Sequence, residues 1–328
     1  MSTPELPVIA GNEQLRADLQ LMRRQNHLPH ALLLHGERGC GKKALAKWFS
    51  MLVLCEDAEH APCGCCKNCR LVSENAHPDV MTAEHSGKRM GFSVETVRAV
   101  RREAGILPNN GDMRIFLFTD ADGMSIQAQN ALLKSVEEPP AHACFVFTVE
   151  TIGTLLPTLL SRMTAKAVFP VSESECVTAL TRLSYSAEEI QSAVSRFGGN
   201  IGKCIGYLSD EMQRQAAETA AGLTAALAQV NEYELLRLLT AAAADKDLLR
   251  RTLELFDMQI RDAAVHSLEG EFRLMGCDRS ASEALAGRLS PRRAMRMHGA
   301  IAEAFADLES NVGAALTVTA LCAALCEA

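Results

Sequence analysis

The sequence predicts an α/β domain built on a parallel sheet, followed by a second half that is entirely helical. Three observations predict this. Short apolar runs alternate with helix-like segments up to residue 170, a glycine-rich segment joins the first run to a helix, and no strand pattern follows residue 170. At 328 residues the chain exceeds what one hydrophobic core usually organises, so we expect more than one domain.

The first elements are a helix, a strand and a second helix. Apolar residues at helical spacing predict a helix over 12–25, and Leu32–Leu34 predicts a buried strand that stops before Gly36. The same spacing predicts a helix over 42–55. A further helix begins after Ser93, which is a suitable N-cap, and ends at Gly105.

The next elements complete the α/β pattern. Apolar runs predict buried strands over 115–118 and 144–147, and the helix between them spans 125–138, where two prolines end it. Pro157 begins a short helix that ends near Arg162. Strands that alternate with helices indicate a mostly parallel, doubly wound sheet.

The second half carries helix signals only. Ser172 with Glu175 and Ser186 with Glu189 have the spacing of capping boxes, and an alanine-rich run over 216–228 predicts closely packed helices. We place domain boundaries near 170 and 210. The expected domains are an α/β domain over 1–170, a small helical domain over 171–210 and an all-α domain over 211–328.

Composition narrows the class of protein. The chain is 48% hydrophobic and 22% charged, as expected of a folded globular protein, and its net charge of −7 argues against a surface matched throughout to nucleic acid. The first residues lack the pattern of a signal peptide, and no apolar stretch approaches the length of a membrane span. We therefore expect a cytoplasmic protein.

The glycine-rich segment fits a phosphate-binding loop. Gly36-Glu37-Arg38-Gly39-Cys40-Gly41-Lys42-Lys43 matches the P-loop pattern G-x-x-x-x-G-K-[ST] at every position but the last. In such a loop, glycines let backbone N–H groups point at a phosphate, and the lysine reaches the β- and γ-phosphates. Gly36, Gly39, Gly41 and Lys42 are therefore the candidate nucleotide-binding residues.

Two positions argue against a complete ATPase site. Lys43 offers an ammonium where a hydroxyl should hold Mg²⁺, and the second strand ends in Thr119-Asp120, where an acidic metal ligand belongs. Two registers are open, one with Thr119 and one with Asp120 at the metal-ligand position. Whether the loop binds ATP or ADP is also open, but we do not expect it to bind Mg²⁺.

Half of the twelve cysteines lie between Cys40 and Cys69, which in a cytosolic chain favours metal binding or chemistry. Cys63, Cys66 and Cys69 share one short segment, and Cys55 can loop back to complete a tetrahedral set of four thiolates. Such a closed shell suits structural Zn²⁺, with Cys65 as a spare thiol. The alternatives are a redox pair at Cys66 and Cys69 and an iron–sulfur cluster.

Several motifs together carry a family resemblance. They are His30–Gly36 before the loop, the inserted cysteines, His77-Pro78-Asp79, Gln129–Pro140 and Ser161-Arg162. With these motifs the chain resembles the delta-prime subunits of bacterial DNA polymerase III, which are AAA+ proteins of the sliding-clamp loader. The resemblance covers roughly residues 1–210, and over 211–328 it extends only to helical character and length.

The resemblance implies a role for each part. Residues 1–170 would form the AAA+ P-loop domain with a zinc module at 55–69, 171–210 the lid domain, and 211–328 the collar that carries oligomerisation. It places Thr119 at the position of the metal-binding acid and Gly202 where motor subunits carry a sensor arginine.

The resemblance also gives Arg162 a role. Ser161-Arg162 resembles the family's Ser-Arg-Cys motif, with Met163 in place of the cysteine, and its arginine would enter the ATP site of a neighbouring subunit. The residues alone favour a solvated arginine that caps the end of the preceding helix.

The implied function is a non-hydrolysing subunit of the DNA polymerase III clamp loader. Its implied partners are the motor subunits and the clamp-opening delta subunit in a hetero-pentameric ring, with the sliding clamp and primer-template DNA, in the nucleoid-associated replisome. The alternatives are an active ATPase motor subunit and a zinc-dependent or thiol redox enzyme. Arg101-Arg102 and Arg292-Arg293 are small basic clusters, which favour solvated helix faces and leave direct contact with DNA open.

Overall fold

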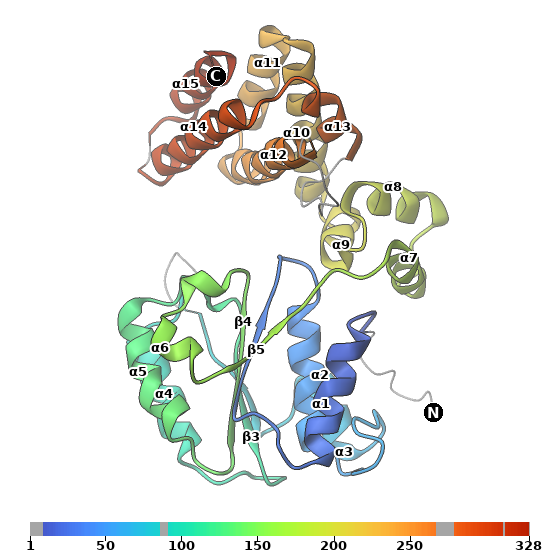
Figure 1. The fold of residues 1–328 in the computed structure, drawn as a ribbon, viewed down its shortest axis with the longest axis vertical. Coiled ribbons are helices and arrows are strands. Elements are labelled where there is room, and N and C mark those ends of the chain that lie inside the picture. Colours follow the sequence, from blue (N-terminus) through green and yellow to red (C-terminus); the bar gives the residue numbers. More distant parts are fainter. Residues whose placement is uncertain (1–8, 86–90, 267–278, 311, 328) are drawn as a thin grey trace. The chain divides into compact units, whose positions relative to one another are not determined.

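A computed structural model describes residues 9–85, 91–266, 279–310 and 312–327 (Figure 1). The chain divides into two compact units, Met1–Glu175 and Cys176–Ala328. Each unit has its own buried core, and each is described here by itself. The boundaries near 170 and 210 that the sequence predicts stay predictions.

The first unit is built on a five-stranded parallel sheet in the order β2-β3-β4-β1-β5. The strands are β1 (Ala31–His35), β2 (Val80–Thr82), β3 (Arg114–Phe118), β4 (Ala143–Val149) and β5 (Thr164–Ala167). The sequence predicts the three central strands, which are almost fully buried. It does not predict the edge strands β2 and β5, because they are short and only partly buried and so lack a long apolar run.

Helices cover both faces of this sheet (Figure 1). They are α1 (Glu13–Arg24), α2 (Lys42–Leu54), α3 (Lys67–Ser73), α4 (Val94–Ala104), α5 (Ile126–Glu137) and α6 (Pro157–Leu160). The Ser93 and Ser125 side chains accept hydrogen bonds from backbone N–H groups in the first turns of α4 and α5, which confirms both predicted starts. Helix α3 was not predicted, because its seven residues lie inside the cysteine-rich segment.

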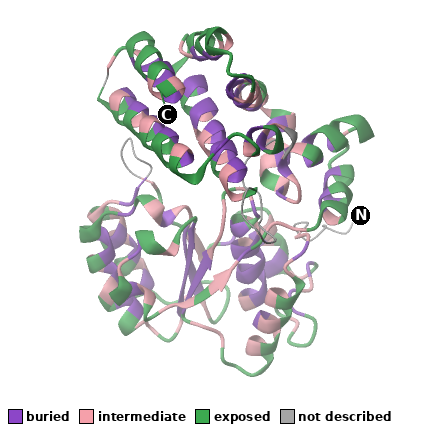
Figure 2. Ribbon diagram, turned by 45° about the horizontal axis from the view of Figure 1, so that its top comes forward, coloured by how far each residue is buried: buried purple, intermediate pink, exposed green. Residues whose placement is uncertain are grey.

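The central strands are buried (Figure 2), and their side chains alternate between two apolar cores. Along β3, Ile115 and Leu117 pack toward α2, whereas Phe116 and Phe118 pack toward α4 and α5. This alternation follows from the two-residue period of a strand. The carboxyl ends of parallel strands meet at one edge of a sheet, so the segments after β1, β3 and β4 lie close together there.

The second half is all helical over its described residues, as the sequence predicts. Its helices are α7 (Glu173–Arg182), α8 (Ala187–Phe197), α9 (Ile201–Ser209), α10 (Glu211–Gln229), α11 (Glu232–Ala242), α12 (Lys246–His266), α13 (Arg279–Ala286), α14 (Pro291–Glu309) and α15 (Ala314–Glu327). Both predicted capping boxes form, at Ser172 with Glu175 and at Ser186 with Glu189.

Helix α12 is the centre of the second unit, because α10, α11, α13 and α14 all pack against it. Phe256 on α12 is fully buried, and the Thr224 hydroxyl of α10 donates a hydrogen bond to Gln259 Oε1 of α12. Among the described residues, no helix is both long and apolar enough to cross a membrane.

Candidate functional site

The glycine-rich loop connects the end of β1 to the start of α2, as predicted. A Cβ atom on Gly36 would lie 2.1 Å from the backbone oxygen of Val168, so only glycine fits beside this chain. Gly41 has a φ of +95° immediately before α2, a conformation that other residues rarely adopt. The glycines therefore give the loop the tight path of a phosphate-binding loop.

Lys42 lies inside this loop and is 6% exposed. Its ammonium donates hydrogen bonds to the backbone oxygens of Gly36, at 2.6 Å, and Glu37, at 2.9 Å. The carboxyl of Glu150, which follows β4, experiences the Lys42 charge. Partial burial raises the pKa of Glu150, and the charge of Lys42 opposes this shift. The predicted loop residues Gly36, Gly39, Gly41 and Lys42 thus form one continuous structure.

Lys43 forms an ion pair with Asp120 across the gap between α2 and the end of β3. The Lys43 Nζ and Asp120 Oδ2 atoms are 2.5 Å apart, and both side chains are about half exposed. In an active P-loop enzyme, the hydroxyl at the position of Lys43 and an acid at the end of this strand hold Mg²⁺. The ammonium of Lys43 therefore occupies the region where a divalent cation would bind, and it repels one.

Thr119 is the first residue after β3. It continues the alternation of Ile115 and Leu117 toward α2, and with Lys43 it lines a cavity of about 290 Å³. Asp120 follows in a left-handed conformation, with a φ of +52°, and its N–H donates to the Thr148 hydroxyl of β4 at 2.8 Å. Thr119 therefore faces the phosphate-loop helix as part of the strand, whereas Asp120 reaches Lys43 from the turn that follows.

Arg162 lies directly after α6 and contacts two elements of its own unit. Its Nη1 donates to the Thr158 backbone oxygen at 2.6 Å and to the Ser161 hydroxyl at 3.1 Å, so the guanidinium caps α6. Its Nη2 lies 2.5 Å from Oε1 of Glu137, the last residue of α5. The side chain is 37% exposed, which leaves part of the guanidinium open to solvent.

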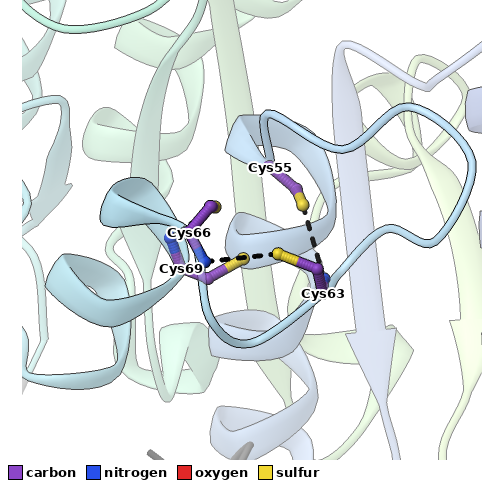
Figure 3. A group of neighbouring side chains, drawn as sticks. All are labelled: Cys55, Cys63, Cys66 and Cys69. Carbon is purple, nitrogen blue, oxygen red and sulfur yellow. Dashed lines mark hydrogen bonds between the residues drawn. The ribbon is translucent and has the colours of Figure 1, made fainter.

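The four predicted cysteines converge (Figure 3). The sulfur atoms of Cys55, Cys63, Cys66 and Cys69 all lie within 4.8 Å of one another. Backbone N–H groups point at three of these sulfurs, from Cys63 to Cys55 Sγ, from Cys66 to Cys63 Sγ and from Cys69 to Cys66 Sγ, at 3.3–3.4 Å. Cys65 is exposed and lies outside this set.

These cysteines are compatible with structural zinc. Tetrahedral Zn²⁺ with sulfur at ~2.3 Å keeps its ligands roughly 3.8 Å apart, so small side-chain shifts close the observed cluster onto an ion. Burial raises the pKa of the Cys63 thiol, but backbone hydrogen bonds from Cys66 and Cys65 outweigh it and lower that pKa to about 6. The hydrogen bonds onto Cys63 favour its thiolate, the form that binds metal, whereas burial raises the pKa of Cys55 and of Cys69.

The His77-Pro78-Asp79 motif links the cysteine module to the sheet. Asn68 of α3 donates to the Leu54 backbone oxygen, and its side-chain oxygen lies 3.3 Å from His77 Nε2. His77 Nδ1 accepts from the Asp79 N–H. Asp79 in turn accepts from the N–H groups of Asn109 and Asn110 before β3. Because each of these side chains is bonded within the protein, we assign the motif a structural role.

Sequence reasoning missed three contacts at these sites. It did not pair Glu137 with Arg162, Lys43 with Asp120 or Asp120 with Thr148, because the residues of each pair are far apart in sequence. Thr148 carried a signal, since it is the polar residue within the apolar run of β4. Such a residue often serves a site at the end of a strand.

The parallel sheet, with a glycine-rich loop and a lysine between β1 and α2, fits an α/β P-loop domain of the AAA+ kind. Residues 11–171 match the family model described as DNA polymerase III, delta subunit. These residues, just under half of the chain, are therefore similar to clamp-loader subunits of DNA polymerase III, delta' subunits among them. This confirms the resemblance predicted from the motifs.

Two curated relatives illustrate the match. DNA polymerase III subunit delta' of Escherichia coli strain K12 is 32% identical over 192 residues, which are 58% of this chain and 57% of that protein. DNA polymerase III subunit gamma/tau of Mycobacterium bovis is 33% identical over 155 residues, 47% of this chain and 27% of that protein. The matches therefore span less than two thirds of either relative.

A solved structure was also found, that of a DNA polymerase III gamma subunit-related protein of Thermotoga maritima. It has a TM-score of 0.44 and 16% identity, and the match covers 94% of this chain and 98% of that one.

Proposed function

We propose that this protein is the delta-prime subunit of a DNA polymerase III clamp loader. In this role it is an AAA+ scaffold that does not hydrolyse ATP and that donates Arg162 to the ATP site of a neighbouring motor subunit while the sliding clamp is loaded onto primed DNA. The observation that carries this proposal is the Lys43–Asp120 ion pair in the region where Mg²⁺ would bind.

The ion pair supports the loss of hydrolysis for a chemical reason. Phosphoryl transfer needs a divalent cation to neutralise charge on the β- and γ-phosphates and an acid to orient water. Lys43 replaces one metal ligand, and Thr119 stands on the strand face where the other would lie. Gly202, in the first turn of α9, offers no side chain for a third phosphate contact. ATP or ADP binding without Mg²⁺ is compatible with this site.

Arg162 is suited to act on a neighbour rather than on its own loop. It leaves α6 with 37% of its side chain exposed, and its contacts are to α5 and α6. A guanidinium stays charged at neutral pH and stabilises negative charge on a transferring phosphoryl group. Because this guanidinium would enter the neighbour's ATP site from another chain, the motor subunit would hydrolyse ATP efficiently only when it is assembled with this chain.

The remaining parts of the proposal concern the metal and the partners. Cys55, Cys63, Cys66 and Cys69 would hold one structural Zn²⁺, which stabilises the segment between α2 and α3. The partners would be the motor subunits and the clamp-opening delta subunit in a hetero-pentameric ring, with the clamp and primer-template DNA, in the nucleoid-associated replisome of the cytoplasm. The net charge of −7 favours contact through these partners over strong independent DNA binding.

An active motor subunit is the second candidate. The similarity to a gamma/tau subunit and the presence of Gly36, Gly41 and Lys42 favour it. The two candidates differ in what the isolated chain does, because a motor subunit keeps both metal ligands in its own site, whereas a scaffold needs only the arginine.

The deciding measurement is ATP hydrolysis by the purified protein alone and after mixing with clamp-loader motor subunits, clamp and primed DNA. We expect no turnover alone. We expect stimulation of the mixture that depends on this chain and is lost with Arg162→Ala, because the neighbouring transition state loses its cation. Folding and assembly should be intact in that variant.

Two results would contradict the proposal. Turnover by the isolated protein that Lys42→Ala abolishes would identify a motor. Unchanged turnover of the mixture with Arg162→Ala, at saturating ATP, clamp and DNA, would remove the role of the arginine.

A further inference from the structure

Two hydrogen bonds and one ion pair hold the Arg162 guanidinium against its own unit. Nη1 donates to the Thr158 backbone oxygen and the Ser161 hydroxyl, and Nη2 forms an ion pair with Glu137 at 2.5 Å. Both hydrogen-bond acceptors belong to the chain around α6, whereas the ion-pair partner is a side chain from α5. Glu137 is therefore the one contact that ties the guanidinium to a second element.

These contacts leave some N–H groups of the guanidinium available to bind a phosphate. A guanidinium has five N–H donors, and the hydrogen bonds from Nη1 account for two of them. The Nε–H group has no partner among the residues that the structure describes, and the neighbouring Nη2 meets Glu137 as an ion pair. Two parallel N–H groups on one edge are the fork that matches two oxygens of a phosphate.

Helix α5, which carries Glu137 at its C-terminal end, is also fixed to α6 near its N-terminal end. Gln129, two turns earlier on α5, is 2% exposed. Its Nε2 donates to the backbone oxygens of Met124 and Thr154, and its Oε1 accepts from the Leu156 N–H, which directly precedes α6. Gln129 therefore fixes the start of α6 to α5, and Glu137 sits where α6 ends.

We propose that Glu137 is a positioning residue for Arg162, an inference that rests on the proposed function of Arg162 in a neighbouring ATP site. The carboxylate holds Nη2 so that the Nε and Nη2 edge is presented with its orientation already set. A free arginine side chain loses considerable rotamer freedom when it is ordered. Because Glu137 already restricts Arg162 in the isolated subunit, less conformational entropy is lost when the subunits assemble.

The ion pair does not cancel the charge of Arg162. Both side chains are more than a third exposed, so water screens the attraction, and the pair is weak. A phosphoryl group in transfer carries more negative charge than one carboxylate and can share the guanidinium through its other edge. The carboxylate therefore orients the arginine without sequestering it.

The test is the Glu137→Gln variant of the full chain in the reconstituted clamp loader, measured as ATP turnover. Glutamine keeps the shape and removes the charge. We expect kcat to fall about two- to fivefold, the range that an exposed ion pair supplies, with KM for ATP unchanged, because the arginine acts in the transition state.

Glu138→Gln is the matched control. It makes the same charge change one residue along, at an exposed carboxylate with no side-chain partner among the described residues, and we expect no change. Glu137→Gln should also have no effect in an Arg162→Ala background. If Glu137→Gln fails to assemble, Glu137→Asp replaces it under the same criteria, because its shorter side chain does not reach Nη2.

The outcomes separate the two proposals. Turnover that is unchanged or raised by Glu137→Gln, or lowered equally in the Arg162→Ala background, overturns the positioning role. Arg162→Ala without effect instead overturns the proposed function itself, whatever Glu137→Gln does.

Discussion

Lys43 places an ammonium at the start of α2, where a P-loop NTPase has a hydroxyl. Its pairing with Asp120 gives this ammonium a fixed carboxylate partner at 2.5 Å, so the charge is held in the region that a divalent cation would occupy. Under the proposed function, we expect the backbone N–H groups of the loop and Lys42 to serve a phosphate, and we expect the positive charge of Lys43 to oppose a divalent cation.

This arrangement makes a prediction for nucleotide binding. We expect the natural protein to bind a fluorescent ATP analogue with the same affinity in Mg²⁺ as in EDTA, whatever that affinity is. The double variant Lys43→Thr with Thr119→Asp supplies a hydroxyl and a carboxylate, and its binding should become about tenfold tighter with Mg²⁺ than with EDTA. Lys43→Thr alone is the control. Mg²⁺-dependent binding by the natural protein would contradict our account of the ion pair.

At the scale of elements, the cysteine module is a loop and a short helix added after α2. Cys69 and Val72 of α3 join the apolar core beside the sheet, and Asn68 and His77 add hydrogen bonds to this packing. Burial lowers the pKa of His77, consistent with a neutral ring that bonds within this network. A metal ion held by the four converging sulfurs would add local order to this segment.

We therefore predict that the purified protein contains one zinc per chain and that a chelator increases hydrogen exchange over residues 55–73, with little change in β1 and β4. Cys66→Ser should lose the metal, because it removes one of the converging sulfurs. Cys65→Ser is the matched control, since its thiol lies outside the cluster, and its zinc content should stay normal. Equal exchange before and after chelation would argue against a structural metal.

At the scale of the whole molecule, the chain consists of two units with separate cores. Trp48, the single tryptophan, is 4% exposed and packs in the core beside α2, so its fluorescence reports on the first unit. Among the described residues of the second unit, Phe256 is the largest fully buried side chain. The two residues allow the stability of each unit to be followed in the same protein.

Phe256→Ala should lower the free energy of unfolding of the helical unit by about 3–5 kcal/mol, because it leaves a cavity beside α12. We expect far-ultraviolet circular dichroism to show a transition at lower denaturant concentration, while the Trp48 fluorescence transition stays in place. A Trp48 transition that shifted equally would mean that the two units unfold as one.

Much of the fold follows from local signals. The buried strands β1, β3 and β4, the capped helices α4 and α5 and the all-helical second half come from apolar periodicity and from serine caps, which act over a few residues. The edge strands β2 and β5 could not be predicted, because their pairing with the sheet, rather than their composition, makes them strands.

The chemistry of the sites divides in the same way. The sequence by itself determined the phosphate loop, the missing hydroxyl at Lys43, the four cysteines and the position of Arg162, because each depends on residue type at fixed spacing. Only the tertiary structure decided that Lys43 meets Asp120 and that Arg162 meets Glu137. These partners are 77 and 25 residues apart in the chain, and parallel strands with their covering helices bring them together. No local pattern encodes a distance set by the packing of whole elements.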